Sequence, residues 1–182
     1  MPTLPRSQMA VALAWAVALG VAAAEPVVIE ETLCNDMPAL SPDGKTVASW
    51  RWERLRLLDA ATGTLLHEFP KVPGDVKDVL WTADGKHVVS HGEAVTWWDV
   101  AARRQARQFQ PERYCSALAF SPDGKRMALG FGNGDIQVCP VDAPEAAVPL
   151  AGHQEIVRDL IWRDRLLFSC GGYGDGTVRV WQ

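Results

Sequence analysis

The pentapeptide SPDGK stands at residues 41–45 and again at residues 121–125, and the related TADGK stands at residues 82–86. Proline presets the backbone angle φ for the second position of a type I turn, and glycine accepts the left-handed conformation that closes it. A type I turn closed by a glycine bulge joins two antiparallel strands. The repeated pentapeptide therefore predicts a β-hairpin at three places in the chain.

The segments that flank these turns are apolar, β-branched or aromatic, which favours strands over helices. Aligning the residue just before each turn gives Leu40, Trp81, Phe120 and, before the RDRL stretch of the last unit, Trp162. The successive separations are 41, 39 and 42 residues, and a period near 40 is typical of a propeller blade of four short strands. The third strands are expected at residues 54–60, 94–100, 135–141 and 177–182.

Composition and charge fit one ordinary globular domain. Hydrophobic residues make up 48% of the chain and charged residues 22%, which is not the composition of a disordered protein. The formal net charge of -4 provides no basic surface. We therefore expect no nucleic-acid partner and only weak attraction to anionic membranes.

The first 24 residues have the pattern of a secretory signal peptide. Arg6 precedes an unbroken apolar run at residues 9–24, which ends in three alanines just before Glu25. An uncleaved anchor is the weaker alternative, because the run is shorter than the roughly 20 residues that span a bilayer. We predict cleavage after Ala24, a mature chain of residues 25–182 without a stable membrane anchor, and a periplasmic or secreted location.

Cysteines and histidines show none of the spacings of metal sites, so no metal and no cofactor is expected. Each cysteine is interpreted as a small buried hydrophobe, with one disulfide as the alternative that an oxidising compartment permits. Three histidines are expected at the surface. The residues concerned are Cys34, Cys115, Cys139 and Cys170, and His67, His87 and His91. The glycine-rich stretches at 130–135 and 171–176 are predicted to be hairpin turns, because no helix follows them to hold a phosphate.

Two units carry further motifs. The second has Trp98 and Asp99 within WWDV, and the fourth has Gly152 and His153 followed by DGTVRVW at residues 175–181. In these motifs the chain resembles the WD-repeat family of β-propellers. The resemblance implies an all-β fold of propeller blades with four antiparallel strands each. About four blades are expected, at residues 34–69, 70–110, 111–150 and 151–182, with residues 26–33 as an extra N-terminal strand.

The same resemblance implies a buried hydrogen-bonded network in the fourth unit. In the family, a histidine, a serine or threonine, an aspartate and a tryptophan form such a chain, and the matching residues are His153, Ser169, Asp175 and Trp181. A connected network satisfies every buried polar group, so these residues are expected to rigidify a blade. Catalysis is not expected, because no GxSxG elbow is present. The first and third units lack both the Trp-Asp and the Gly-His pair.

Four blades are few for a ring of this family, so we expect an open arc or partial propeller and not a full seven-bladed ring. Open ends expose an unpaired edge and an apolar face, and self-association through these blade edges is therefore expected. Three alternatives remain: a fragment of a longer propeller, an arc that pairs with a second copy, and a closed small ring.

The function predicted from these patterns is a non-catalytic exported scaffold that binds a protein partner. In propellers, the loops that join second to third strands and blade to blade gather on one face. Exposed aromatic and charged residues there can anchor a partner, although they can equally cover the sheet edges and solvate the rim. The candidate partner-binding residues are Trp52, His91, Phe131, Tyr173, Arg113, Gln154 and Arg158.

An enzyme is the competing hypothesis. Residues 57–69 also resemble the repeat of quinone-cofactor propellers, so the alternative is a truncated or partial propeller of an exported quinone-dependent or lactonase-like enzyme. However, no cluster of Glu, Asn and Asp marks a calcium-and-quinone site or a lactonase metal site. The scaffold hypothesis is therefore favoured.

Overall fold

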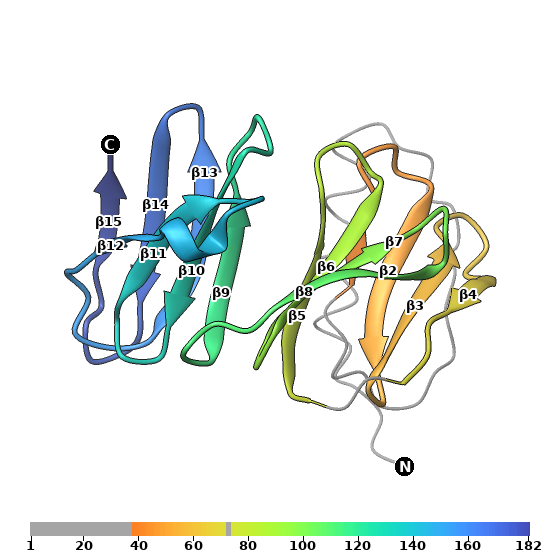
Figure 1. Cartoon of the computed structure of the whole chain (residues 1–182), viewed down its shortest axis with the longest axis horizontal. Coiled ribbons are helices and arrows are strands. Elements are labelled where there is room, and N and C mark those ends of the chain that lie inside the picture. Colours follow the sequence, from red (N-terminus) through yellow and green to blue (C-terminus); the bar gives the residue numbers. More distant parts are fainter. Residues whose placement is uncertain (1–37, 72–73) are drawn as a thin grey trace, which may run out of the picture. The chain divides into compact units, whose positions relative to one another are not determined.

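The computed structural model describes residues 38–71 and 74–182, and these residues form four antiparallel sheets (Figure 1). The first sheet has the order β1 (Ala39–Leu40), β2 (Thr46–Arg51), β3 (Arg54–Asp59) and β4 (Leu65–Glu68). The second has the order β5 (Val76–Trp81), β6 (His87–Gly92), β7 (Val95–Asp99) and β8 (Arg104–Phe109). Strands that follow one another in the chain therefore lie side by side in each sheet.

The third and fourth sheets repeat this meander. The third contains β9 (Cys115–Phe120), β10 (Arg126–Phe131), β11 (Ile136–Pro140) and β12 (Val148–Leu150), with a short 3₁₀ helix, η1 (Pro144–Ala146), before β12. The fourth contains β13 (Val157–Arg163), β14 (Leu166–Gly171) and β15 (Val178–Trp181). The predicted all-β fold is confirmed, and β3, β7, β11 and β15 lie where the third strands were expected. The predicted signal peptide and the extra strand at residues 26–33 lie outside the described residues.

The repeated pentapeptide forms the same turn in three blades. In the first, the Ser41 carbonyl accepts a hydrogen bond from the Gly44 amide at 2.9 Å, and the Ser41 hydroxyl donates to Asp43 Oδ1 at 2.6 Å. The same bonds recur at residues 82–86 and 121–125. The glycines have the left-handed φ that the turn chemistry predicts, +72° at Gly44, +68° at Gly85 and +68° at Gly124.

Replacing Gly44 with valine is expected to lower the free energy of unfolding by about 1 to 3 kcal/mol, because a β-branched residue is strained at positive φ. A Cβ at Gly44 would meet no atom within 4 Å, so the loss measures backbone strain alone. Gly132→Val is the control, since Gly132 also faces open space but has no positive φ. Urea titration checks the result, and equal stability of Gly44→Val and wild type would contradict it.

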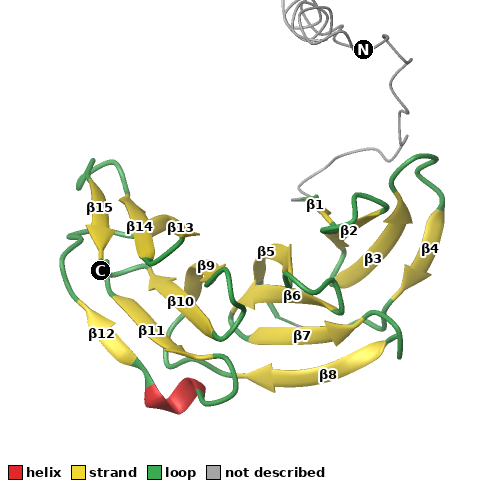
Figure 2. Cartoon of the chain, turned by 90° about the horizontal axis from the view of Figure 1, so that it is seen from above, coloured by secondary structure: helices red, strands yellow, loops and turns green. Residues whose placement is uncertain are grey.

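Three hydrophobic clusters join the sheets in chain order. One is shared by the first and second sheets around Leu57 and Trp98, and another by the second and third around Trp97 and Phe131. The third cluster is shared by the third and fourth sheets around Ile136, and none of the three joins the fourth sheet to the first. The blades within the described residues thus form an open row, as expected, and not a closed ring (Figure 2).

The cysteines that the structure describes carry free thiols. Cys115 and Cys139 are buried, as small hydrophobes would be, and burial raises the pKa of Cys115 to about 12 and that of Cys139 to about 11. Cys170 is half-buried, and Cys34 lies outside the described residues. Within residues 38–71 and 74–182, no helix has the length and apolar character needed to cross a membrane.

Candidate functional site

The four residues matched to the repeat motif meet in the fourth blade. His153, in the β12–β13 connection, lies with Nδ1 2.7 Å from Asp175 Oδ2 and with Nε2 2.7 Å from Ser169 Oγ. Trp181 in β15 donates its indole N–H to the same serine oxygen at 2.9 Å. The hydrogen bonds therefore connect the loop before the blade to β14, to the β14–β15 loop and to β15.

The carboxylate of Asp175 is held by several donors. The Thr177 hydroxyl donates to it, the Gln154 amide donates at 2.9 Å, and the His153 ring lies against it, so its pKa is well below its usual range. The carboxylate is therefore ionised at neutral pH. Ser169 is 2% exposed and its oxygen is already covered by a tryptophan and a histidine, so it cannot reach a substrate as a nucleophile would. We propose that this network rigidifies the blade.

The second blade holds half of this network, which the sequence analysis did not identify. Trp98 donates its indole N–H to Ser90 Oγ at 3.0 Å, as Trp181 does to Ser169. Ser90 occupies the same register as Ser169, because it pairs with β5 where Ser169 pairs with β13. The sequence signal is a serine on the second strand that faces the tryptophan of the third strand.

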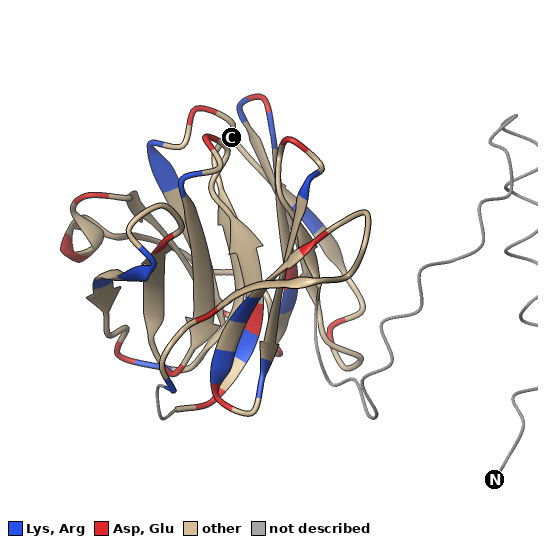
Figure 3. Ribbon diagram, turned by 90° about the vertical axis from the view of Figure 1, so that its right-hand side faces the viewer, with Lys and Arg blue, Asp and Glu red and all other residues tan. Residues whose placement is uncertain are grey.

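Four of the predicted partner-binding residues lie in exposed loops or at strand starts of the third and fourth blades. Tyr173 is 93% exposed, and the guanidinium carbon of Arg158 lies 4.4 Å from its ring centroid. Gln154 is exposed next to Asp175, and Arg113 forms an exposed ion pair with Asp135 at 2.7 Å. The charged residues of this region lie on loops and strand ends (Figure 3).

Trp52 is exposed in the first blade. It lies 74% exposed at the tip of the β2–β3 turn, where it and Glu53 both have positive φ, +52° and +62°. Two consecutive residues with positive φ form the type I′ turn that suits the twist of a hairpin. The guanidinium carbon of Arg51 lies 5.9 Å from the indole centroid.

His91 and Phe131 do not lie on the surface, which corrects the prediction. They are 3% and 2% exposed and sit between the second and third blades, where His91 Nδ1 lies 3.1 Å from the Cys115 carbonyl oxygen. Burial lowers the pKa of His91. A β-bulge shifts the strand register opposite each of these positions, and this places the two residues in the sheets and not in the loops. His67 and His87, also expected at the surface, are half-buried.

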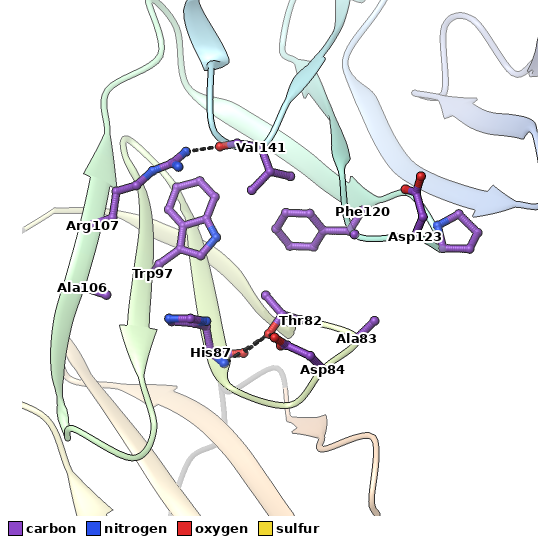
Figure 4. Close-up of a pocket in the computed structure, with 12 residues that line it drawn as sticks. Thr82, Ala83, Asp84, His87, Trp97, Ala106, Arg107, Phe120, Asp123 and Val141 are labelled. Carbon is purple, nitrogen blue, oxygen red and sulfur yellow. Dashed lines mark hydrogen bonds between the residues drawn. The ribbon is translucent and has the colours of Figure 1, made fainter.

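A cavity of about 440 Å³ opens between the second and third blades, on loops that the sequence analysis did not select (Figure 4). Its walls include Trp97 and Phe120, and Arg107 stacks over Trp97 with 4.3 Å between its guanidinium carbon and the ring centroid. Arg107 also donates to the Val141 carbonyl, and the Thr82 hydroxyl donates to Asp84 at 2.7 Å. These polar groups already have partners within the fold.

No catalytic or metal constellation accompanies these features in the part of the chain that the structure describes. Groups of three or more His, Cys, Asp or Glu side chains placed to hold a metal ion do not occur among those residues. The quinone-dependent or lactonase-like alternative therefore gains no support from the geometry.

Comparisons with known proteins agree with the fold. The family described as "WD domain, G-beta repeat" matches residues 146–182. The anaphase-promoting complex subunit cdc20 of Dictyostelium discoideum is 28% identical over 92 residues, which cover 49% of this chain and 18% of that protein. The solved structures of the RRP9 WD40 repeats and of U3-55K each superpose with a TM-score of 0.69 and 24% identity. They cover 82% of this chain and 49% and 50% of theirs.

These comparisons contradict the predicted periplasmic or secreted location. The relatives and structural neighbours, cdc20, RRP9 and U3-55K, are intracellular proteins. The apolar run at residues 9–24, on which the prediction rested, lies outside the described residues. An apolar segment of that length is a property of composition alone, and it does not distinguish an export signal from other apolar segments.

The chain spans about half the length of the solved structures that it matches. The matched repeat at residues 146–182 contains the hydrogen-bonded network of the fourth blade and the exposed Tyr173. With the repeat recognised in that blade, and the blade architecture present throughout residues 38–71 and 74–182, this chain is a WD-repeat protein.

Proposed function

We propose that the protein is a non-catalytic scaffold that binds a protein partner through the loops above its fourth blade. WD-repeat proteins typically mediate protein–protein interactions, which supports this class of function. The binding surface is proposed to consist of Tyr173, Arg158 and Gln154, with Arg113 at its rim. We name it the Tyr173 surface.

The observation that carries the proposal is the exposure of Tyr173. A tyrosine that is 93% exposed leaves most of its apolar ring in water, and tyrosine and arginine are the residue types enriched among the energetic centres of interfaces. Arg158 stacks on this ring, so both side chains are held in one arrangement before a partner arrives. Little side-chain entropy is then lost on binding.

The loop that carries Tyr173 is itself held in place. The carbonyl of Gly172 accepts hydrogen bonds from the amides of Asp175 at 3.1 Å and Gly176 at 2.8 Å. A Cβ at Gly174 would lie 2.7 Å from the carboxyl carbon of Glu155, so the loop packs closely on the β12–β13 connection. Because Asp175 belongs to the buried network, the network supports a binding loop and not a reaction.

Replacing Tyr173 with alanine is expected to weaken partner binding about 30-fold, which corresponds to about 2 kcal/mol for a central interface residue. The partner is first identified by incorporating a photoreactive amino acid at position 173 and sequencing the crosslinked protein. The affinity of the two purified proteins is then measured by calorimetry for wild type and variant.

Val148→Ala is the matched control, since Val148 is 61% exposed but lies in β12, away from the Tyr173 surface. Its affinity for the partner should equal that of wild type. A Tyr173→Ala variant that binds as tightly as Val148→Ala would reject the proposed surface.

A further inference from the structure

A small polar cavity lies between the first and second blades. It has a volume of about 70 Å³, several times the roughly 10–15 Å³ that one water molecule requires. Two carboxylates, those of Asp75 and Glu93, contribute to its lining. The lining side chains that bear on the argument are Trp50, Asp75, Ser90, Glu93, Thr96 and Trp98.

Two hydroxyl groups in this cavity have unused hydrogen-bonding capacity. Thr96 is 4% exposed, and its hydroxyl bonds to none of the described residues. Ser90 is 2% exposed; its oxygen accepts from Trp98, but its own proton finds no acceptor in the described part of the chain. Buried polar groups are rarely left unpaired, because doing so costs free energy. Such groups indicate a place that a ligand with matching donors and acceptors would fill.

The fourth blade shows which ligand fits next to this serine. There the equivalent serine, Ser169, also accepts from a tryptophan, and the imidazole of His153 lies 2.7 Å from it. The other nitrogen of that ring contacts the carboxylate of Asp175. The second blade has the same Trp–Ser pair, but the described residues place no histidine beside it. The cavity adjoins Ser90 on the side that lacks the ring.

The walls of the cavity are fixed by backbone contacts. The Glu93 amide donates to the Asp75 carbonyl at 3.0 Å, and Gln110 donates its side-chain amide to the Glu93 carbonyl at 2.8 Å. A Cβ at Gly92 would lie 3.0 Å from the Lys77 nitrogen, so only glycine allows the two chain segments to approach this closely. A preformed cavity loses little free energy to ordering when a ligand enters.

We infer that this cavity binds the imidazole ring of a histidine supplied by a partner protein. The ring N–H would donate to one of the two carboxylates, and the second ring nitrogen would accept the proton of the Ser90 hydroxyl. Both halves of the His–Ser–carboxylate pattern of the fourth blade are thereby restored in the second. The identity of the ligand as a partner's side chain rests on the proposed function, whereas the chemistry of the cavity does not.

Free imidazole is the first probe, and the indole N–H resonance of Trp98 is the reporter, assigned with Trp98→Phe. Titration of the full chain with imidazole is expected to shift this resonance saturably, with a dissociation constant on the order of 1 mM for so small a ligand. 1-Methylimidazole keeps the accepting nitrogen but lacks the N–H, and it should bind about tenfold more weakly. An unmoved Trp98 resonance well above the millimolar range overturns the inference.

Thr96→Val tests the location without breaking a bond of the free protein. It replaces a hydroxyl that bonds to none of the described residues by a methyl group of similar size, so the fold should persist, while imidazole affinity is expected to fall about fivefold. Thr46→Val is the matched control, because Thr46 lies in β2 and does not line the cavity. Equal loss in both variants would overturn the assignment of the site.

The tripeptide Gly-His-Gly distinguishes a protein side chain from a free small molecule. It is expected to shift the Trp98 resonance at least as strongly as imidazole does, since the cavity opens to the loops. Binding of imidazole but not of the tripeptide would overturn the assignment to a partner's histidine. The proposed Tyr173 surface is tested on other residues, so its failure and a failure here can be told apart.

Discussion

Replacing Gly134 with alanine is expected to destabilise the protein by about 3 kcal/mol or more, from backbone strain and overpacking together. Gly134 has a φ of +90° in the β10–β11 turn. A Cβ there would overlap the carbonyl oxygen of His153, lie 2.7 Å from its carbonyl carbon and lie 2.9 Å from the Glu155 carbonyl oxygen. These are backbone atoms of the connection that positions His153, so they cannot move without disturbing the network of the fourth blade.

Gly124→Ala is the matched control for this change. Gly124 also has a positive φ, +68°, but a Cβ at that position would meet nothing within 4 Å. Its replacement should cost only the backbone term, roughly 1 kcal/mol. Urea unfolding followed by tryptophan fluorescence measures both variants, and similar free energies of unfolding would show that the close approach at Gly134 has no energetic consequence.

The second large effect is expected in the hydrogen-bonded network of the fourth blade. His153→Ala and Trp181→Phe should each lower the free energy of unfolding by about 1 to 3 kcal/mol, because each leaves Ser169 with a missing partner. The double variant should lose less than the sum of the two, since both residues act on one hydroxyl. A double-mutant cycle in urea measures this coupling.

Trp162→Phe combined with His153→Ala is the control cycle. Trp162 lies in the same blade, but its indole N–H bonds to no described residue, so the substitution removes no hydrogen bond from the network. The two effects should therefore add. Strict additivity in the His153 and Trp181 cycle as well would mean that these residues do not share a network.

Much of the fold could be predicted from local patterns. The three pentapeptides form the hairpin turns that their proline, aspartate and glycine residues favour, and the spacing near 40 residues corresponds to one blade per unit. The residues matched to the repeat motif, among them His153 and Ser169, lie within hydrogen-bonding distance of one another. The exposed aromatic rings of Trp52 and Tyr173 were also selected from the sequence.

The prediction failed where the position of a side chain depends on contacts with another blade. His91 and Phe131 were assigned to surface loops, but they lie between the second and third sheets. Their strand partners contain β-bulges, and such irregularities leave no clear signature in the alternation of apolar and polar residues. The location predicted from the N-terminal run was wrong because it rested on one segment and not on the repeats.

The sequence by itself determined the hairpins, the number of repeating units and the residues that could form a network, because these depend on φ preferences, strand alternation and spacing along one chain. Only the tertiary structure decided which faces of neighbouring blades meet. Those contacts stack Arg158 on Tyr173, bring Gly134 against His153 and leave the cavity beside Ser90. The physical reason is that each of these features joins segments distant in sequence, so it depends on sheet packing and register, which no local pattern encodes.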